Sequence, residues 1–87
     1  MRHFTSSKFW QCFNALPSHI QSQARDSYEL LKKNPKHPSL QFKHVKNGAF
    51  RSVRVSLGYR AIGVPVDQGV QWFWIGSHAV YDKLIVS

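Results

Sequence analysis

The chain contains few acidic residues and a single cysteine, and each scarcity excludes a class of protein. Four Asp and Glu stand against twelve Lys and Arg, which gives the 87 residues a formal net charge of +8. The one cysteine, Cys12, cannot form an internal disulfide, so the chain lacks the covalent staple of small secreted domains. We therefore expect a protein of a reducing compartment, the cytoplasm.

Long apolar runs are also absent. No run approaches the roughly 20 residues of a membrane-spanning helix, and the first ten residues hold no apolar stretch of signal-peptide length. Membrane insertion and export are therefore not expected. Hydrophobic residues nevertheless make up 43% of the chain and aromatic residues 14%, too much for a disordered basic tail. The length then predicts one folded domain, residues 1–87.

Positive charge is concentrated in the middle of the chain. Between Glu29 and Asp67 there is no acidic residue. That interval contains Lys32, Lys33, Lys36, Lys43, Lys46, Arg51, Arg54 and Arg60, together with His37 and His44. Such a surface either keeps a small protein soluble or binds the phosphates of a nucleic acid in a salt-dependent way.

Helical periodicity precedes residue 35. The apolar face of a short first helix is formed by Phe9, Cys12, Phe13 and Leu16. Pro17 ends this helix, and the spacing of Ser18 and Gln21 predicts a capping box at the start of a second. The second helix is expected to run to about Lys33, because Pro35 disfavours helical geometry before it.

Strand periodicity follows, divided by turn sequences at residues 47–48, 57–58 and 67–69. Four strands are predicted near residues 40–46, 50–56, 59–66 and 70–76, residues 2–5 could form a further strand, and a short C-terminal helical turn is expected from Ser77 to Leu84. The order predicts an α+β fold, with two N-terminal helices packed on an antiparallel sheet of about four strands.

The last strand is apolar on both faces. We assign Phe73 and Ile75 to the core, which places Trp72 and Trp74 on the opposite face. A paired tryptophan surface is costly unless a protein partner or RNA covers it.

Three segments together resemble the RelE/ParE superfamily, the toxins of bacterial type II toxin-antitoxin modules. They are LLKKNPKHPSLQFK (residues 30–43), SVRVSLGYRAIG (residues 52–63) and WFWIGSHAVYDKLI (residues 72–85). The final GSH is most similar to the YafQ and HigB-type members, in which a histidine follows the last strand. The resemblance implies a small curved sheet with the helices on one face. It also implies an exposed concave face that, in the RNase branch, accepts messenger RNA in the ribosomal A site.

The resemblance implies roles for three residues. Arg60, of a Tyr-Arg pair, corresponds to a phosphate-contacting residue, His78 to an acid or base, and Tyr81 to an aromatic residue that lines the pocket. The best-known branch has two lysines on the strand before the pair. This chain has Ser52 and Arg54 near those positions, so no lysine stands there to act as a base.

Cleavage through the ribose 2′-hydroxyl needs a proton acceptor, a proton donor and positive charge. Imidazole titrates near neutral pH, which suits His78 to proton transfer, and the guanidinium of Arg60 matches phosphate oxygens. Two plainer alternatives remain open. His78 would be an ordinary surface residue, and Tyr81 would pack on the sheet instead of stacking on a base. Arg54 would equally form a salt bridge with a carboxylate, that of Glu29, Asp82 or the C-terminus.

The wider substrate-binding set is predicted to be Lys43, His44, Lys46, Arg51, Arg54 and Tyr59. Within it, His44 is either a second proton carrier or part of the basic rim. The remaining histidines, His3, His19 and His37, lack metal-ligand spacing. We therefore expect neither a metal site nor another cofactor.

The sequence therefore predicts a toxin that cleaves messenger RNA on the ribosome without a metal. A cognate antitoxin protein is expected to inhibit it. A ParE-like inhibitor of DNA gyrase on the same fold is one alternative, and it would not need the set of His78, Arg60 and Tyr81. A catalytically silent nucleic-acid-binding module is the other.

Overall fold

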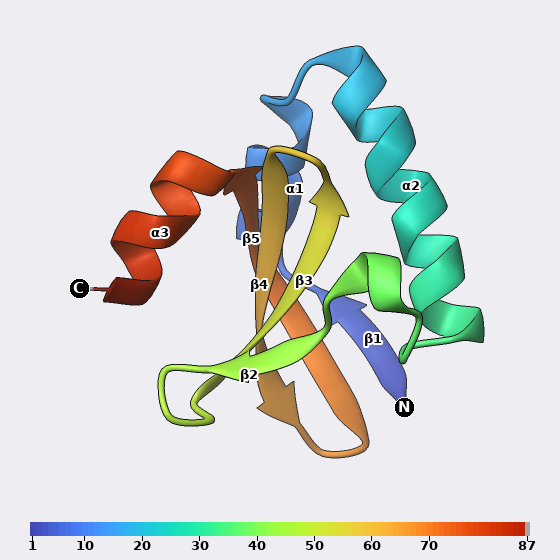
Figure 1. The fold of residues 1–87 in the computed structure, drawn as a ribbon, viewed down its shortest axis with the longest axis vertical. Helices are drawn as coiled ribbons and strands as arrows, with labels where there is room; N and C mark the ends of the chain where they lie inside the picture. The colour runs from blue at the N-terminus through green and yellow to red at the C-terminus, as the bar shows by residue number, and fades with distance from the viewer. Residues whose placement is uncertain (87) are drawn as a thin grey trace.

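The computed structural model describes residues 1–86, which form three α-helices, one 3-10 turn and a five-stranded sheet. In chain order the elements are β1 (Arg2–Thr5), α1 (Ser7–Asn14), α2 (Ser18–Lys33), η1 (Pro38–Leu40), β2 (Lys43–Val45), β3 (Phe50–Ser56), β4 (Tyr59–Val66), β5 (Gly69–Ser77) and α3 (His78–Val86). The predicted α+β class is confirmed. Figure 1 shows α2 and α3 on opposite sides of the strands.

The sheet has the order β1-β5-β4-β3-β2. Consecutive strands from β2 to β5 pair in antiparallel fashion, as the turn sequences predict, but β1 pairs with β5 in parallel. The sheet is therefore mixed rather than antiparallel and has five strands rather than about four. No local signal reveals the pairing of β1 with β5, because it joins the first and the last strand of the chain.

The helix-covered core explains most of the predicted elements. Phe13 of α1 and Leu31 of α2 pack with Val53, Ala61 and Ile75 of the sheet in one cluster of buried residues. Phe9, Cys12 and Leu16 pack partly buried against it, as their helical spacing predicts. The second helix ends at Lys33, also as predicted.

The start of α2 differs from the expected capping box. The N-cap is Pro17, which has no side-chain hydrogen bond, so Ser18 is already helical. Gln21 instead donates through Nε2 to the carbonyls of Phe13, at 3.0 Å, and Leu16, at 3.2 Å. The glutamine therefore ties the second helix to the end of the first, because a proline N-cap offers no N–H for the return bond of a capping box.

The strand predicted for residues 40–46 is also shorter than expected. Residues up to Leu40 belong to η1, and Gln41 adopts a left-handed conformation at φ 46°. Only Lys43–Val45 then pair with β3. The left-handed residue interrupts the extended backbone, and it turns Gln41 toward β4, as described below.

A β-bulge in β5 changes the expected faces of Trp72 and Phe73, whereas Trp74 lies away from the helix-covered core as predicted. Ile62 pairs with Trp74 and Gly63 with Trp72, so Phe73 is the extra residue. Trp72, at 3% exposure, and Ile75, at the same exposure, both enter the helix-covered core, whereas Phe73 is only half-buried. The assignment of Phe73 to the core and Trp72 to the opposite face is therefore wrong. Gly63 leaves space for the Trp72 ring, which a side chain at residue 63 would meet.

The pairing of β1 with β5 depends on a glycine. A Cβ atom added at Gly69 would overlap the backbone carbonyl of Arg2, its partner in β1. We expect Gly69→Ala to lower the free energy of unfolding by about 2 kcal/mol, within the range of overpacked sites. Urea denaturation measures it.

Gly58→Ala is the matched control, because nothing lies within 4 Å of a Cβ added there. It should change stability by less than about 0.5 kcal/mol. Equal effects of the two substitutions would contradict the close approach at β1.

Candidate functional site

The sheet face that points away from α1 and α2 carries a row of charged and small residues. Arg54 of β3 pairs with Arg60 of β4, which pairs in turn with Gly76 of β5. Directly paired residues project to the same face, and Val53, beside Arg54, belongs to the helix-covered core. The row therefore lies on the other side of the sheet, which we call the outer face.

Arg60 is buried on the outer face, with 3% of its surface exposed. Its Nε donates to Ser52 Oγ at 3.1 Å, Nη1 to Gln41 Oε1 at 3.0 Å and Nη2 to the Gln41 carbonyl at 3.2 Å. Its Cζ lies 5.0 Å from the ring centroid of Tyr81. No carboxylate among residues 1–86 pairs with it. Neutral acceptors and one aromatic ring therefore hold a positive charge that has no counterion within the described part of the chain.

His78 lies at the surface, where α3 begins. Its backbone N–H donates to the Gly58 carbonyl at 2.8 Å, and Ser77 Oγ accepts from Val80 N at 3.4 Å as a helix cap. The side chain is 51% exposed, and Nδ1 lies 3.0 Å from Asp82 Oδ2. The sheet thus fixes the position of the helix start, and the imidazole remains open to solvent.

Tyr81 connects these two residues. The centroid of its ring lies 5.6 Å from the centroid of the His78 ring. The same tyrosine ring also covers the guanidinium of Arg60. Tyr81 itself is only 4% exposed, so it packs on the sheet, and stacking on a base would require it to move. A substrate phosphate would reach Arg60 only after the same movement. The structure therefore brings His78, Tyr81 and Arg60 into one continuous contact.

Two members of the wider predicted set share the outer face. Lys43 pairs with Ser52, whose hydroxyl contacts Arg60, and Arg54 pairs with Arg60 itself. The carboxylates proposed as structural partners for Arg54 are engaged elsewhere: Glu29 binds Lys32 at 2.9 Å, and Asp82 binds His78. The C-terminal carboxylate belongs to Ser87 and lies outside the described residues. Arg54 is thus half-buried beside the site and has no acidic partner among residues 1–86.

The other members lie elsewhere. Arg51 pairs with Gly63, which pairs with the core residue Trp72, so alternation directs it and its partner His44 toward the helix-covered face. Arg51 also donates through Nη1 to the Gly48 carbonyl at 2.9 Å. Tyr59 packs partly buried against the core, and Lys46 lies in the turn between β2 and β3 at φ 54°.

Sequence reasoning missed two residues of this site, Gln41 and Asp82. The spacing of His78 and Asp82, four residues apart on a helix, is the signal that predicts their contact. Gln41 offers no such signal, because it reaches Arg60 from a turn 19 positions away in the chain.

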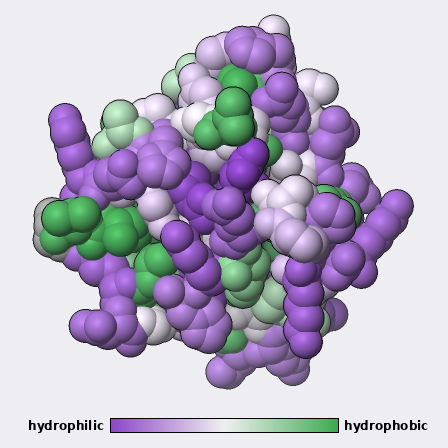
Figure 2. Space-filling model, in the orientation of Figure 1, coloured by the Kyte–Doolittle hydropathy of each residue, from purple (hydrophilic) through white to green (hydrophobic). Residues whose placement is uncertain are grey.

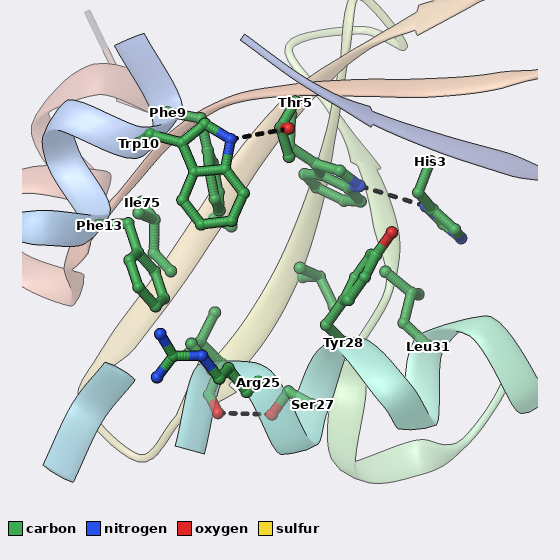
Figure 3. Close-up of a pocket in the computed structure, with 15 residues that line it drawn as sticks. His3, Thr5, Phe9, Trp10, Phe13, Arg25, Ser27, Tyr28, Leu31 and Ile75 are labelled. Atoms are coloured by element: carbon green, nitrogen blue, oxygen red, sulfur yellow. Dashed lines mark hydrogen bonds between the residues drawn. The ribbon is translucent and has the colours of Figure 1, made fainter. Parts of the chain in front are cut away.

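A partly open, mostly apolar pocket of about 160 Å³ lies on the opposite, helix-covered side of the sheet. Figure 3 shows Trp10, Tyr28 and Arg25 around it. His3 Nδ1 accepts a hydrogen bond from Trp72 Nε1 at 3.2 Å. Burial lowers the pKa of His3, and the charges of the N-terminus and Lys32 act in the same direction, which favours the neutral ring that this bond requires. The pocket is therefore distinct from the site around His78.

Two absences apply to residues 1–86. No helix there is both long and apolar enough to cross a membrane. The same residues bring together no group of three or more His, Cys, Asp and Glu side chains that could hold a metal ion.

Comparison with known proteins gives one family match. A family model described as a ParE-like toxin domain matches residues 18–83. No curated protein sequence matches the chain significantly.

Several solved structures share its fold. YafQ from E. coli strain BL21(DE3) has a TM-score of 0.70 at 14% identity, covering 92% of this chain and 96% of that one. A RelB-RelE antitoxin-toxin complex from Methanococcus jannaschii gives a TM-score of 0.70 at 16% identity, covering 92% and 96%. A YoeB/ParE toxin from Agrobacterium tumefaciens gives 0.65 at 11% identity, covering 90% and 99%. At these identities the likeness concerns the fold.

Proposed function

Because the chain belongs to the ParE-like toxin family, we propose that it is the toxin of a type II toxin-antitoxin module and acts as a metal-independent endoribonuclease on messenger RNA, on the ribosome. The observation that carries this proposal is the contact of an exposed histidine with Tyr81, which covers the buried charge of Arg60. A protein that only occupies a partner's surface does not need a proton carrier in that position.

In the proposed reaction, a ribose 2′-oxygen attacks the adjacent phosphorus and the 5′-oxygen of the next nucleotide leaves. One proton leaves the 2′-hydroxyl and another reaches the departing oxygen, and the phosphate passes through a state of greater negative charge. We assign one of these proton transfers to His78. The ring is exposed, and because Nδ1 contacts Asp82, Nε2 is the ring nitrogen left for the substrate.

Positive charge is assigned to three residues of the outer face. Arg54 and Lys43 are accessible enough to contact phosphates. Arg60 lies beneath Tyr81, so we assign it an indirect role: its charge favours an anion nearby, and its contacts hold Gln41 and Tyr81 in place. The ring of Tyr81 in turn supports His78. His78 is thus the catalytic candidate, and Arg60 and Tyr81 position it.

The proposed partner is a cognate antitoxin protein. Helix α3 exposes apolar side chains, with Val80 at 45% and Val86 at 85% exposure. Figure 2 shows hydrophobic atoms where α3 ends, on a surface that is otherwise mostly hydrophilic. An acidic, amphipathic antitoxin segment would match both this apolar helix and the net charge of +8.

Transcript-end mapping tests the proposed function. After induction in cells that lack the antitoxin, we expect new transcript ends inside translated regions, together with arrest of growth. Purified protein should cleave messenger RNA in translating ribosomes and leave the supercoiling activity of gyrase unchanged.

The two rival functions give different results. Stalled supercoiling with intact RNA would indicate a gyrase inhibitor. Salt-sensitive RNA binding without cleavage at any pH would indicate a silent binding module.

A further inference from the structure

Asp82 stands against the charge pattern of its surroundings. The chain has only four acidic residues, and one of them lies on the helix that carries His78. A carboxylate here repels the phosphodiester that the outer face would attract, so its position calls for a compensating role. Its Oδ2 lies 3.0 Å from His78 Nδ1, which indicates what that role is.

The chemistry of the contact determines where the imidazole carries its proton. An ionised carboxylate only accepts hydrogen bonds. When the ring is neutral, the contact therefore places the hydrogen on Nδ1 and leaves Nε2 with a free lone pair, because the partner of one ring nitrogen sets the tautomer. When the ring is protonated, the same contact directs the acidic Nε2–H outward.

The orientation of the ring is fixed from several directions. The backbone of His78 is anchored to Gly58, and the cap by Ser77 stabilises the first turn of α3. Tyr81 contacts the ring at an interplanar angle of 54°, and Asp82 holds Nδ1 from the next turn. Rotation of the ring by half a turn would break the carboxylate contact.

We infer that Asp82 is the positioning residue of His78, holding the hydrogen on Nδ1 and presenting Nε2 to the substrate. The catalytic consequence rests on the proposed endoribonuclease function. The tautomer does not, because it is a property of the free protein. The titratable and charged groups that face the imidazole are Asp82 and Tyr81 from α3, with Arg60 of β4 behind the tyrosine ring.

The first test is a nuclear magnetic resonance measurement of the free protein. Long-range ¹H–¹⁵N correlation spectra, recorded where the imidazole is neutral, are expected to show His78 with Nδ1 protonated. Asp82→Asn should shift the ring toward the tautomer with Nε2 protonated, because the amide can also donate to Nδ1. A wild-type ring already protonated on Nε2, or a ring unchanged by the substitution, would overturn the inference.

Asp67→Asn is the matched control. It changes the net charge by the same amount, but Asp67 is exposed in the turn at the opposite end of β4. The tautomer of His78 should be unchanged in this variant. Circular dichroism is expected to show both variants folded, because an exposed pair contributes little to stability.

The second test is the rate of RNA cleavage. Asp82→Asn should lower kcat by about 10- to 100-fold, by analogy with the carboxylates that orient metal-binding histidines. KM should stay the same or fall, because the substitution removes a negative charge that repels the phosphates of the substrate. A loss confined to KM would contradict positioning.

The two proposals can fail separately. If the wild-type protein cleaves no RNA but Asp82→Asn still switches the tautomer, the proposed function fails and the positioning role stands. If the wild type cleaves RNA but Asp82→Asn alters neither tautomer nor kcat, only the positioning role fails.

Discussion

His78→Ala is expected to abolish growth arrest on induction and to lower the rate of messenger RNA cleavage by about 10²- to 10⁴-fold, the usual contribution of a positioned acid or base. The substitution removes the exposed imidazole at the outer face and leaves the backbone bond from residue 78 to Gly58 in place. The measurement compares cleavage rates of purified proteins and growth after induction without antitoxin.

His19→Ala is the control for this experiment. His19 is exposed on α2, outside the site, so its replacement should leave toxicity unchanged. His78→Gln adds a second check, because glutamine retains hydrogen bonding but transfers no proton at neutral pH. Growth arrest by both His78 variants at the wild-type level would show that the histidine is not catalytic.

Arg60→Ala is expected to lower the free energy of unfolding by about 3 kcal/mol. It removes three hydrogen bonds from a charged donor, two to Gln41 and one to Ser52, and leaves the hydroxyl of Ser52 buried without this partner. It also opens space beneath Tyr81. Arg60→Lys should recover only part of the loss, since a lysine ammonium cannot reproduce the planar fork of a guanidinium. Urea denaturation gives these values.

Arg54→Ala provides a matched comparison on the paired strand. Arg54 stands directly opposite Arg60, has no acidic partner among residues 1–86 and places a like charge beside it. Its removal should change stability by less than about 0.5 kcal/mol. Equal destabilisation by the two substitutions would show that the buried contacts of Arg60 add nothing to stability beyond what the half-buried Arg54 contributes.

The sequence predicts those parts of the fold that depend on neighbouring residues. The end of α2 and the bounds of β3 and β4 follow from periodicity and turn sequences, and the structure confirms them, while β5 is one residue longer at each end than predicted. The segment of β1 is one of the expected strands, but its parallel pairing with β5 and the bulge at Phe73 depend on contacts between distant segments, which periodicity does not record. The same is true of Gln41, whose contact with Arg60 arises from a left-handed turn.

The candidate site shows the same division. The resemblance suggested His78, Tyr81 and Arg60 as a set, and their contact in the structure agrees with such a site, although their catalytic roles stay a prediction. The wider substrate-binding set, by contrast, follows mainly from the positive charge of its members. Strand alternation separates Arg51 and His44 from Arg54, because adjacent positions in a strand project to opposite faces.

The bulge at Phe73 decides which face each later side chain of β5 occupies. If the same residues continued past Trp72 without the bulge, Phe73 would pair with Ile62 and every residue after it would exchange faces. Ile75 would leave the core, Gly76 would no longer stand opposite Arg60, and α3 would start from the wrong side of the sheet. The extra residue therefore acts as a spacer that lets one strand deliver a tryptophan to the interior and a helix to the exterior.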